Sequence, residues 1–165
     1  MGNYLNQDGK KFYEITHSDI YVDKTELLTY TNSVLQTLQK YICISRPRRF
    51  GKSITASMIA AYYSRGCDAK ELFSPYKIAR NLDFDTYRNK YNTLFLNMQE
   101  FLSRSDDVEG MLTLMQRRIL SDLKQKYPEY VREEDLVFAM QDVYSHTKRS
   151  FVILIDEWDC LFREY

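Results

Sequence analysis

Successive apolar residues occur in three short runs along the 165-residue chain and predict three strands. The runs are YICIS at 41–45, TLFLNM at 93–98 and FVILID at 151–156. A short apolar run is typical of a strand that is buried on both faces of a parallel sheet. The run at 151–156 is the clearest, because five apolar residues end in a carboxylate. A shorter stretch, FYEI at 12–15, is a candidate edge strand.

Helical spacing of apolar residues predicts a helix on each side of the first apolar run. Asp23 followed by Glu26 resembles a capping pair. The helix that it opens places five apolar residues on one face: Leu27, Leu28, Val34, Leu35 and Leu38. A second helix follows residue 53 and ends near Gly66, since glycine is a natural C-terminal cap. Its face carries Ile54, Met58, Ala61 and Tyr62.

The second half of the chain shows a similar alternation of helices and strands. Residues 67–92 have a weak pattern, which predicts short helical pieces around Pro75. Asp106 and Asp107 precede a long helix that Tyr127 and Pro128 close, and its face carries Leu112, Met115, Ile119 and Leu123. Another helix is expected from about 134 to 147, on Leu136, Met140, Val143 and Thr147. Strands that alternate with helices predict an α/β fold with a mostly parallel sheet flanked by helices.

Composition narrows the class of protein and gives no function. Twenty-three basic and twenty-three acidic residues cancel, so net charge does not indicate nucleic acid or a membrane surface as a partner. No apolar run approaches the roughly 18 residues that a membrane span needs. Cys43, Cys67 and Cys160 are odd in number and scattered, which favours free thiols in a reducing cytoplasm. We therefore expect a cytoplasmic protein with no membrane partner.

The segment SRPRRFGKS at 45–53 ends like a phosphate-binding loop between a predicted strand and a predicted helix. In such a loop, backbone N–H groups at the helix N-terminus surround phosphate oxygens. Gly51 permits close approach of the backbone, Lys52 is the cation for the outer phosphates, and Ser53 supplies a hydroxyl for Mg²⁺. This part of the sequence predicts a site for ATP and Mg²⁺.

A second motif is needed, because a Gly-Lys-Ser triplet alone is common. The strand at 151–156 ends in Asp156 and is followed by Glu157, where a P-loop ATPase places its second motif. Asp156 would hold the magnesium ion, and Glu157 would polarise the water that attacks the γ-phosphate. The alternative is that these two acids are only a solvated strand end.

The entrance of the loop departs from the usual pattern G-x-x-x-x-G-K-[ST]. Arg46 stands where the first glycine is expected, and Pro47 lacks an N–H group that could serve a phosphate. Against these losses, Arg46, Arg48 and Arg49 provide three guanidinium groups suited to phosphate oxygens. Any one of these arginines could instead pair with a neighbouring carboxylate, and a nucleic-acid-binding turn is a further alternative.

With these motifs in place, the chain resembles the bacterial AAA-ATPase-like family of predicted P-loop ATPases. Its phosphate loop R-P-R-R-F-G-K-S matches at 46–53, and arginine is the usual residue of the family at position 46. Other matches are Y-V-D-K-T at 21–25, LFSPYKI at 72–78 and FVILIDEWD at 151–159. The resemblance runs through nearly the whole chain.

The resemblance implies a P-loop NTPase fold of the additional-strand type, with Glu157 as catalytic base. Residues 1–40 would form an N-terminal segment and helix, and 41–165 the P-loop core. The elements normally found after the Asp-Glu (Walker B) strand would lie beyond Tyr165, so we expect a truncated piece of a longer protein. Members of the family often continue into a PD-(D/E)XK nuclease-like domain. Such a domain, or another protein, is the expected partner.

These observations lead to one prediction of function and two alternatives. We expect an ATP-binding module that hydrolyses ATP with Mg²⁺ in the complete protein and drives a conformational change in an attached or partner domain. We expect the chain alone to bind Mg²⁺–ATP weakly and to turn it over slowly or not at all. The alternatives are a nucleotide-binding switch or interaction module without turnover, and a nucleic-acid-binding domain that uses the arginine cluster.

The predicted site residues fall into three groups. The catalytic residues are Glu157 and Lys52, and the magnesium ligands are Ser53 and Asp156. The nucleotide would be bound by Arg48, Arg49, Phe50, Gly51, Lys52, Ser53 and Ile54.

Overall fold

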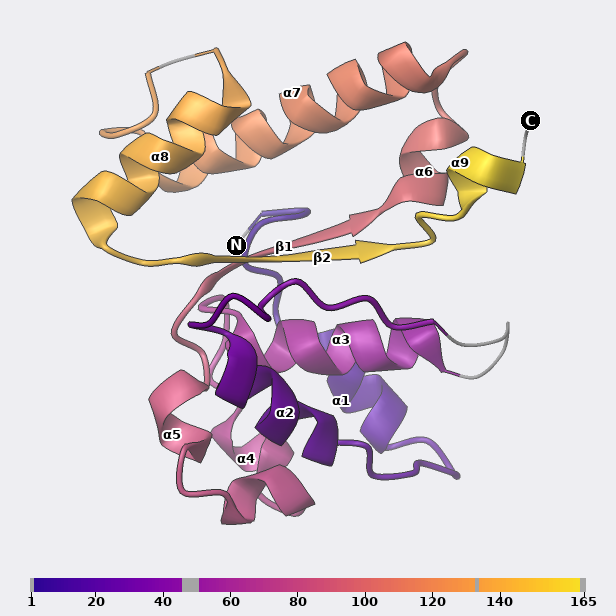
Figure 1. The fold of residues 1–165 in the computed structure, drawn as a ribbon, viewed down its shortest axis with the longest axis vertical. Helices are drawn as coiled ribbons and strands as arrows, with labels where there is room; N and C mark the ends of the chain where they lie inside the picture. Colours follow the sequence, from indigo (N-terminus) through magenta and orange to yellow (C-terminus); the bar gives the residue numbers. More distant parts are fainter. Residues whose placement is uncertain (1, 46–50, 133, 164–165) are drawn as a thin grey trace. The chain divides into compact units, whose positions relative to one another are not determined.

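A computed structural model describes residues 2–45, 51–132 and 134–163 of the chain (Figure 1). The chain divides into two compact units. One consists of Met1–Gln7 and Tyr91–Tyr165, and we call it the sheet unit; the other is Asp8–Lys90, the helical unit. The boundary at residue 40 that the sequence suggests stays a prediction.

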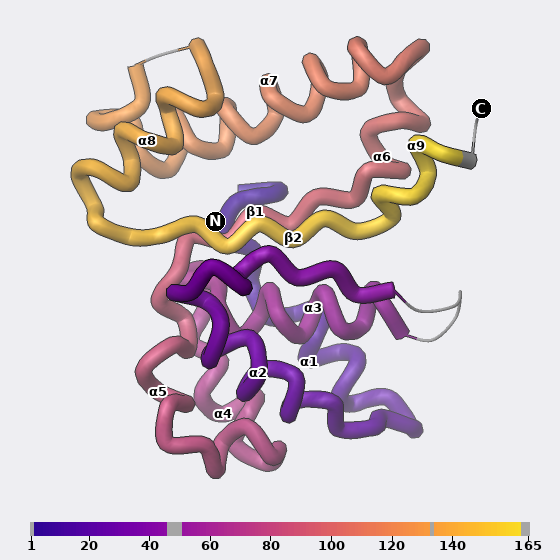
Figure 2. The backbone as a smooth tube through the Cα atoms, in the orientation of Figure 1, coloured from indigo at the N-terminus to yellow at the C-terminus, as the bar shows by residue number. Residues whose placement is uncertain are grey.

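The sheet unit contains two parallel strands, β1 (Asn92–Asn97) and β2 (Phe151–Asp156). Their register pairs Asn92 with Phe151 at one end and Asn97 with Asp156 at the other. Both strands were expected from the sequence, and their parallel pairing confirms that part of the predicted sheet. The N-terminal segment runs beside β1, where Leu5 forms an antiparallel bridge with Leu94 (Figure 2).

Helices α6 (Met98–Leu102), α7 (Val108–Lys126), α8 (Leu136–Thr147) and α9 (Cys160–Arg163) complete the sheet unit. Asp107 caps α7 by accepting a hydrogen bond from the Gly110 N–H, and Asp135 caps α8 in the same way through the Phe138 N–H. Helices α7 and α8 confirm the two helices that the sequence predicts in this part of the chain. The short helix α6 was not predicted.

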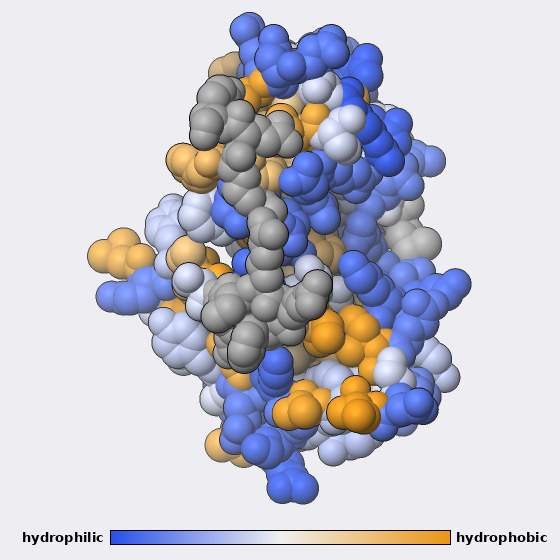
Figure 3. All heavy atoms as spheres, turned by 90° about the vertical axis from the view of Figure 1, so that its right-hand side faces the viewer, coloured by the Kyte–Doolittle hydropathy of each residue, from blue (hydrophilic) through white to orange (hydrophobic). Residues whose placement is uncertain are grey.

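Long helix α7 packs against α6 and α8, and the buried residues on its inner face belong to the same core as residues of β1. Ile119 and Leu123 are buried as expected, whereas Leu112 is 41% exposed and Met111 is buried in its place. The core of the unit also includes Tyr4, Leu5, Leu94, Leu96, Met98, Phe101, Leu120, Tyr127, Ala139 and Val143. Hydrophilic side chains dominate the surface over α7, in the uppermost part of Figure 3.

A buried carboxylate ties the N-terminal segment to α7. Asp122 is 6% exposed, and its Oδ2 accepts hydrogen bonds from the backbone N–H groups of Tyr4 at 2.7 Å and Leu5 at 3.1 Å. The approach is so close that a Cβ atom at Gly2 would lie 2.5 Å from the same oxygen. Only glycine therefore fits at position 2 without movement of Asp122.

The helical unit contains α1 (Lys10–Thr16), α2 (Glu26–Val34), α3 (Lys52–Tyr63), α4 (Lys70–Phe73), the 3-10 helix η1 (Lys77–Arg80) and α5 (Phe84–Tyr87). Helices α2 and α3 and the short pieces around Pro75 were expected. Two helix ends differ from the prediction. Helix α2 ends at Val34, which leaves Leu38 outside it and 90% exposed, and Ser64 rather than Gly66 is the C-cap of α3.

The predicted edge strand at 12–15 is wrong, because these residues lie in α1. Phe12 and Ile15 are three residues apart, so they share a helix face, and the buried Phe12 ring stacks on Phe73 at 5.0 Å. A strand would have placed Phe12 and Ile15 on opposite faces.

The predicted strand at 41–45 is also wrong, because no strand or helix is assigned there. Tyr41 is 86% exposed and Ile42 is 37% exposed. An apolar run becomes a strand only when a neighbouring backbone supplies ladder hydrogen bonds, and among the described residues none pairs with this segment.

A buried hydrogen-bond network joins α2 to α3. The Tyr63 hydroxyl donates to Asn32 Oδ1 at 2.7 Å, and Asn32 Nδ2 donates to the Tyr62 hydroxyl at 3.1 Å. The Tyr62 hydroxyl in turn donates to the Phe84 carbonyl at 2.9 Å. Tyr62 and Tyr63 are almost fully buried, and the burial raises the pKa of Tyr62 to about 12. The C-terminal end of α3 is thus fixed in the unit.

The described residues form a mixed α/β structure with a small two-stranded parallel sheet. None of their helices is both long enough and apolar enough to cross a membrane.

Replacing Asp122 by alanine tests the tie between the N-terminal segment and α7. Asp122→Ala leaves two buried N–H groups without an acceptor, so we expect the free energy of unfolding to fall by about 2–3 kcal/mol. Urea denaturation measures this change. Asp106→Ala, an exposed aspartate before the same helix, is the control and should change stability by less than about 0.5 kcal/mol. Equal stability of the two variants would contradict the assignment.

Candidate functional site

The phosphate loop predicted from the sequence begins outside the described residues, at 46–50, so the predicted roles of Arg48, Arg49 and Phe50 stay predictions. The described part begins at Gly51, the N-cap of α3, which has φ 77° and ψ 27°. This left-handed conformation is unfavourable for residues with a Cβ atom and is readily adopted by glycine. The Gly-Lys-Ser sequence therefore turns sharply into a helix, as a phosphate-binding turn requires.

The first turn of α3 presents backbone N–H groups that the helix itself does not use. The first intrahelical bond runs from the Thr55 N–H to the Gly51 carbonyl at 2.9 Å. The N–H groups of Lys52, Ser53 and Ile54 thus have no acceptor within the helix. Together with the positive end of the helix dipole, they favour binding of an anion.

Lys52 is half-buried and Ser53 is exposed at the start of α3. Ser57 Oγ donates a hydrogen bond to the Ser53 carbonyl at 2.8 Å. This bond uses the backbone of Ser53 and does not involve its hydroxyl group. Further along, Met58 and Ala61 are each 1% exposed. The helix is therefore fixed by its buried residues while its first turn stays accessible.

A second lysine, Lys24, lies at the same helix start; the family resemblance implies that the segment at 21–25 packs near the nucleotide, but the sequence did not single out Lys24 itself. A Cβ atom built on Gly51 would lie 3.1 Å from Lys24 Nζ. Lys24 belongs to the Y-V-D-K-T segment at 21–25, so the signal that could have found it is the conjunction of that segment with the phosphate loop. The structure brings Lys24, Gly51 and Lys52 together within the helical unit.

The residues on either side of Lys24 fix its backbone. Asp23 Oδ1 accepts from the Thr25 N–H at 2.8 Å, and Asp23 Oδ2 accepts from the Lys77 N–H at 3.0 Å. Thr25 is fully buried, and its Oγ1 accepts from the Ile78 N–H at 3.1 Å. Burial of Asp23 would by itself raise its pKa, but the hydrogen bonds from Lys77 and Thr25 outweigh this and lower it. Asp23 thus binds backbone groups and does not act as the N-cap of α2, which is Thr25.

The second predicted motif lies at the carboxyl end of β2 in the sheet unit. Asp156 is 8% exposed and pairs in register with Asn97 at the end of β1. Asp156 Oδ1 accepts a hydrogen bond from the Glu157 N–H at 2.9 Å. In open α/β sheets, ligands bind outside the carboxyl ends of parallel strands, which is where these residues lie.

Glu157 has an unusual backbone conformation directly after this strand. Among the described residues, four that are not glycine have positive φ: Asn6, Asn89, Lys148 and Glu157. Asparagine tolerates this region, and Lys148 is the C-cap of α8. Glu157, with φ 55°, has neither explanation. Strained backbone of this kind is concentrated at functional sites, which favours a functional role for Glu157.

Asn97 is a candidate site residue that sequence reasoning missed. Its side-chain oxygen accepts from the Glu100 N–H at 3.2 Å and caps α6, while its register places it beside Asp156. The available signal was a polar residue at the end of a predicted strand of a parallel sheet.

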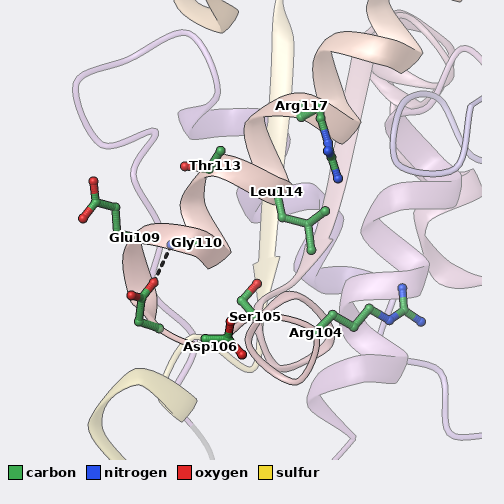
Figure 4. A pocket seen from close by; sticks show the side chains of 9 residues that line it. Arg104, Ser105, Asp106, Glu109, Gly110, Thr113, Leu114 and Arg117 are labelled. Atoms are coloured by element: carbon green, nitrogen blue, oxygen red, sulfur yellow. Dashed lines mark hydrogen bonds between the residues drawn. The ribbon is translucent and has the colours of Figure 1, made fainter.

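Two cavities, one in each unit, are lined by residues other than the predicted site residues. In the sheet unit, a shallow depression lies where α6 leads into α7 (Figure 4). Its lining mixes both signs of charge, and two of its charged groups are engaged: Asp107 caps α7 and Arg104 pairs with Glu100 at 2.8 Å. In the helical unit, a second groove is lined by Tyr13, His17, Cys67, Leu72, Pro75 and Tyr76, among others. No cluster of three or more His, Cys, Asp or Glu side chains suited to a metal occurs in the part of the chain that the structure describes.

Comparison with known proteins gives one match. Residues 9–164 match the family model AAA-ATPase_like, described as a predicted AAA-ATPase. No curated protein and no solved structure matches the chain. The match extends over most of both units and includes the helix start at Gly51 and the strand end at Asp156.

The pH dependence of stability tests the contacts of Asp23. Because the folded-state pKa of Asp23 is lowered, its contribution is present above the unfolded-state value near 3.9 and is lost as the pH falls through the folded-state value. We expect Asp23→Asn to lower the free energy of unfolding by about 1 kcal/mol at pH 7, and the difference from the wild type to shrink below about pH 4. Urea denaturation at both pH values measures it. The control is Asp19→Asn, which changes an exposed aspartate. If the free energy of unfolding of Asp23→Asn differs from that of the wild type by the same amount at pH 3 as at pH 7, the role of the charge is refuted.

Proposed function

Because the chain belongs to the predicted AAA-ATPase family, we propose that it is an ATP-binding module that binds ATP with Mg²⁺ and, in the complete protein, hydrolyses it. The proposal also holds that hydrolysis drives a conformational change in an attached or partner domain. The observation that carries the proposal is the start of α3, where Gly51 in the left-handed region leads Lys52 and Ser53 into a helix with unused N–H groups.

In this proposal the phosphates of ATP lie against the first turn of α3. The N–H groups of residues 51–54 bind phosphate oxygens, and the Lys52 ammonium binds the outer phosphates. Arg48, Arg49 and Phe50 are proposed to continue the same contact surface upstream. Adenine recognition is not assigned to any residue.

Ser53 and Asp156 are suited in donor chemistry to hold Mg²⁺. The ion prefers oxygen ligands and commonly takes only one or two from carboxylates, with phosphate and water supplying the rest. A serine hydroxyl at the start of α3 and a carboxylate at the end of a parallel strand fit this requirement. When bound, Mg²⁺ would neutralise negative charge on the phosphates.

Glu157 is proposed to act as general base for water. Water attacks the γ-phosphorus, the bond between this phosphorus and the β–γ bridging oxygen breaks, and ADP leaves with the electron pair of that bond. The proton of the attacking water passes to the Glu157 carboxylate. The buried Asp156 holds the Glu157 N–H at 2.9 Å, which fixes the backbone that carries the base.

Lys52→Ala tests nucleotide binding. Loss of a charge-assisted contact to phosphate should weaken binding of Mg²⁺–ATP by about 10- to 100-fold. Titration calorimetry on the full chain measures this affinity. The control is Lys70→Ala, which removes a lysine from α4, and it should bind as the wild type does. Equal affinities for the wild type and Lys52→Ala would refute the proposed phosphate site.

Glu157→Gln separates hydrolysis from binding. The amide cannot accept the proton of water, so kcat should fall by about 10²- to 10⁴-fold while ATP affinity is retained. Phosphate release and calorimetry on the same samples of the complete protein give the two values, with Glu129→Gln as an exposed control. No turnover in the complete wild-type protein, with intact ATP binding, would instead identify a nucleotide switch. Salt-sensitive DNA binding that does not need Lys52 would favour the nucleic-acid alternative.

A further inference from the structure

We propose that Lys24 is a second phosphate-binding cation of the nucleotide site, supplied from outside the phosphate loop. The inference rests on the proposed function, because it concerns the same bound triphosphate. It assigns a role to the Y-V-D-K-T segment at 21–25, which the sequence motifs of the phosphate loop do not include.

The position of the Lys24 ammonium carries the inference. Nζ lies 3.1 Å from the point that a Cβ atom of residue 51 would occupy. The ammonium therefore lies beside the glycine that opens α3, at the start of the helix whose first N–H groups are unused. From this position it can pair with an anion held by those N–H groups.

The electrostatics of this position favour a bound anion. Lys24 brings a positive charge to the positive end of a helix dipole, and the first residue of that helix is itself a lysine, Lys52. Positive side chains near a helix N-terminus are unfavourable, because the positive end of the helix dipole and each other's charge repel them. Among the described residues, the Lys24 ammonium forms no hydrogen bond or ion pair that would compensate for this. Several negative charges on a triphosphate would supply the missing compensation.

The nearest acidic neighbours in sequence are engaged elsewhere. Asp23 binds the N–H groups of Thr25 and Lys77, and Glu26 pairs with the Lys77 ammonium at 3.1 Å. Neither acid pairs with the Lys24 ammonium among the ion pairs of the described residues, so neither of them balances its charge.

Hydrogen bonds on both sides of Lys24 fix the backbone that carries this lysine. Asp23 and Thr25 are hydrogen-bonded to η1 on both sides of Lys24. Tyr21 packs edge-on against Phe12 at 5.8 Å and against Tyr76 at 5.3 Å. Because the backbone is already ordered, less conformational entropy is lost when the lysine binds phosphate.

A cation at this place should distinguish nucleotides by their number of phosphates. The charge of Lys24 adds to that of Lys52, so its contribution grows with the negative charge at the helix start. We therefore expect Lys24 to matter most for ATP, less for ADP and least for AMP.

The experiment measures affinities of the full chain for ATP, ADP and AMP, each with Mg²⁺, by titration calorimetry. Lys24→Met keeps most of the side-chain volume and removes the charge. We expect about a tenfold loss of ATP affinity, a smaller loss for ADP and little change for AMP. Lys24→Arg should restore most of the affinity, and Lys10→Met, which removes an exposed lysine from α1, should bind as the wild type does.

Thermal unfolding without nucleotide separates this role from a structural one. If Lys24 only supported the fold, Lys24→Met would lower Tm. Removing an uncompensated charge from the helix start should instead leave Tm unchanged or raise it by about 1–3 °C.

Each outcome decides between the two proposals. Wild-type affinity in Lys24→Met, with loss of ATP binding in Lys52→Ala, overturns the role of Lys24 and leaves the proposed function standing. Equal losses for ATP and AMP, or a lowered Tm, also overturn it. A wild-type chain that binds no ATP overturns the proposed function and this inference together.

Discussion

The buried hydrogen bonds of Tyr62 and Tyr63 with Asn32 are the constraint on which the geometry of the helical unit depends. They fix the C-terminal end of α3 against α2, while the first turn of α3 stays accessible. A helix that is anchored at one end holds its other end in a defined place, because its backbone hydrogen bonds make it stiff. The unused N–H groups after Gly51 are therefore presented by a fixed scaffold. Lys24 is fixed separately, through the bonds of its neighbours to η1.

The sheet unit uses a different device to place its polar residues. Parallel pairing brings the carboxyl ends of β1 and β2 to the same edge, so that Asn97 lies in register with Asp156. Each of these side chains also binds an N–H group of the chain that follows its strand. The two strand ends are thus held by these side chains, of which Asp156 is the proposed magnesium ligand.

Sequence patterns were sufficient where a segment and its immediate surroundings decide the structure. The runs at 93–98 and 151–156 became strands because each is the other's partner, and the apolar face after residue 53 became α3. The runs at 12–15 and 41–45 failed, since a strand needs a neighbour that a local pattern does not report. Lys24 was not singled out for a related reason: its proximity to Gly51 joins residues that are distant in sequence. The motifs themselves were readable, because Gly51 and Asp156 stand at the ends of regular elements.

The crowding of Gly51 by Lys24 affects how chemical variants of this turn are to be understood. An L-alanine at position 51 would face an unfavourable dihedral angle and would also press its methyl group against the ammonium. Any defect would therefore mix a backbone effect with displacement of a cation. A D-alanine introduced by semisynthesis accepts positive φ and directs its methyl group away from the L-side. A D-alanine at position 51 would thus separate the effect of the backbone conformation of the turn from the effect of displacing the Lys24 ammonium.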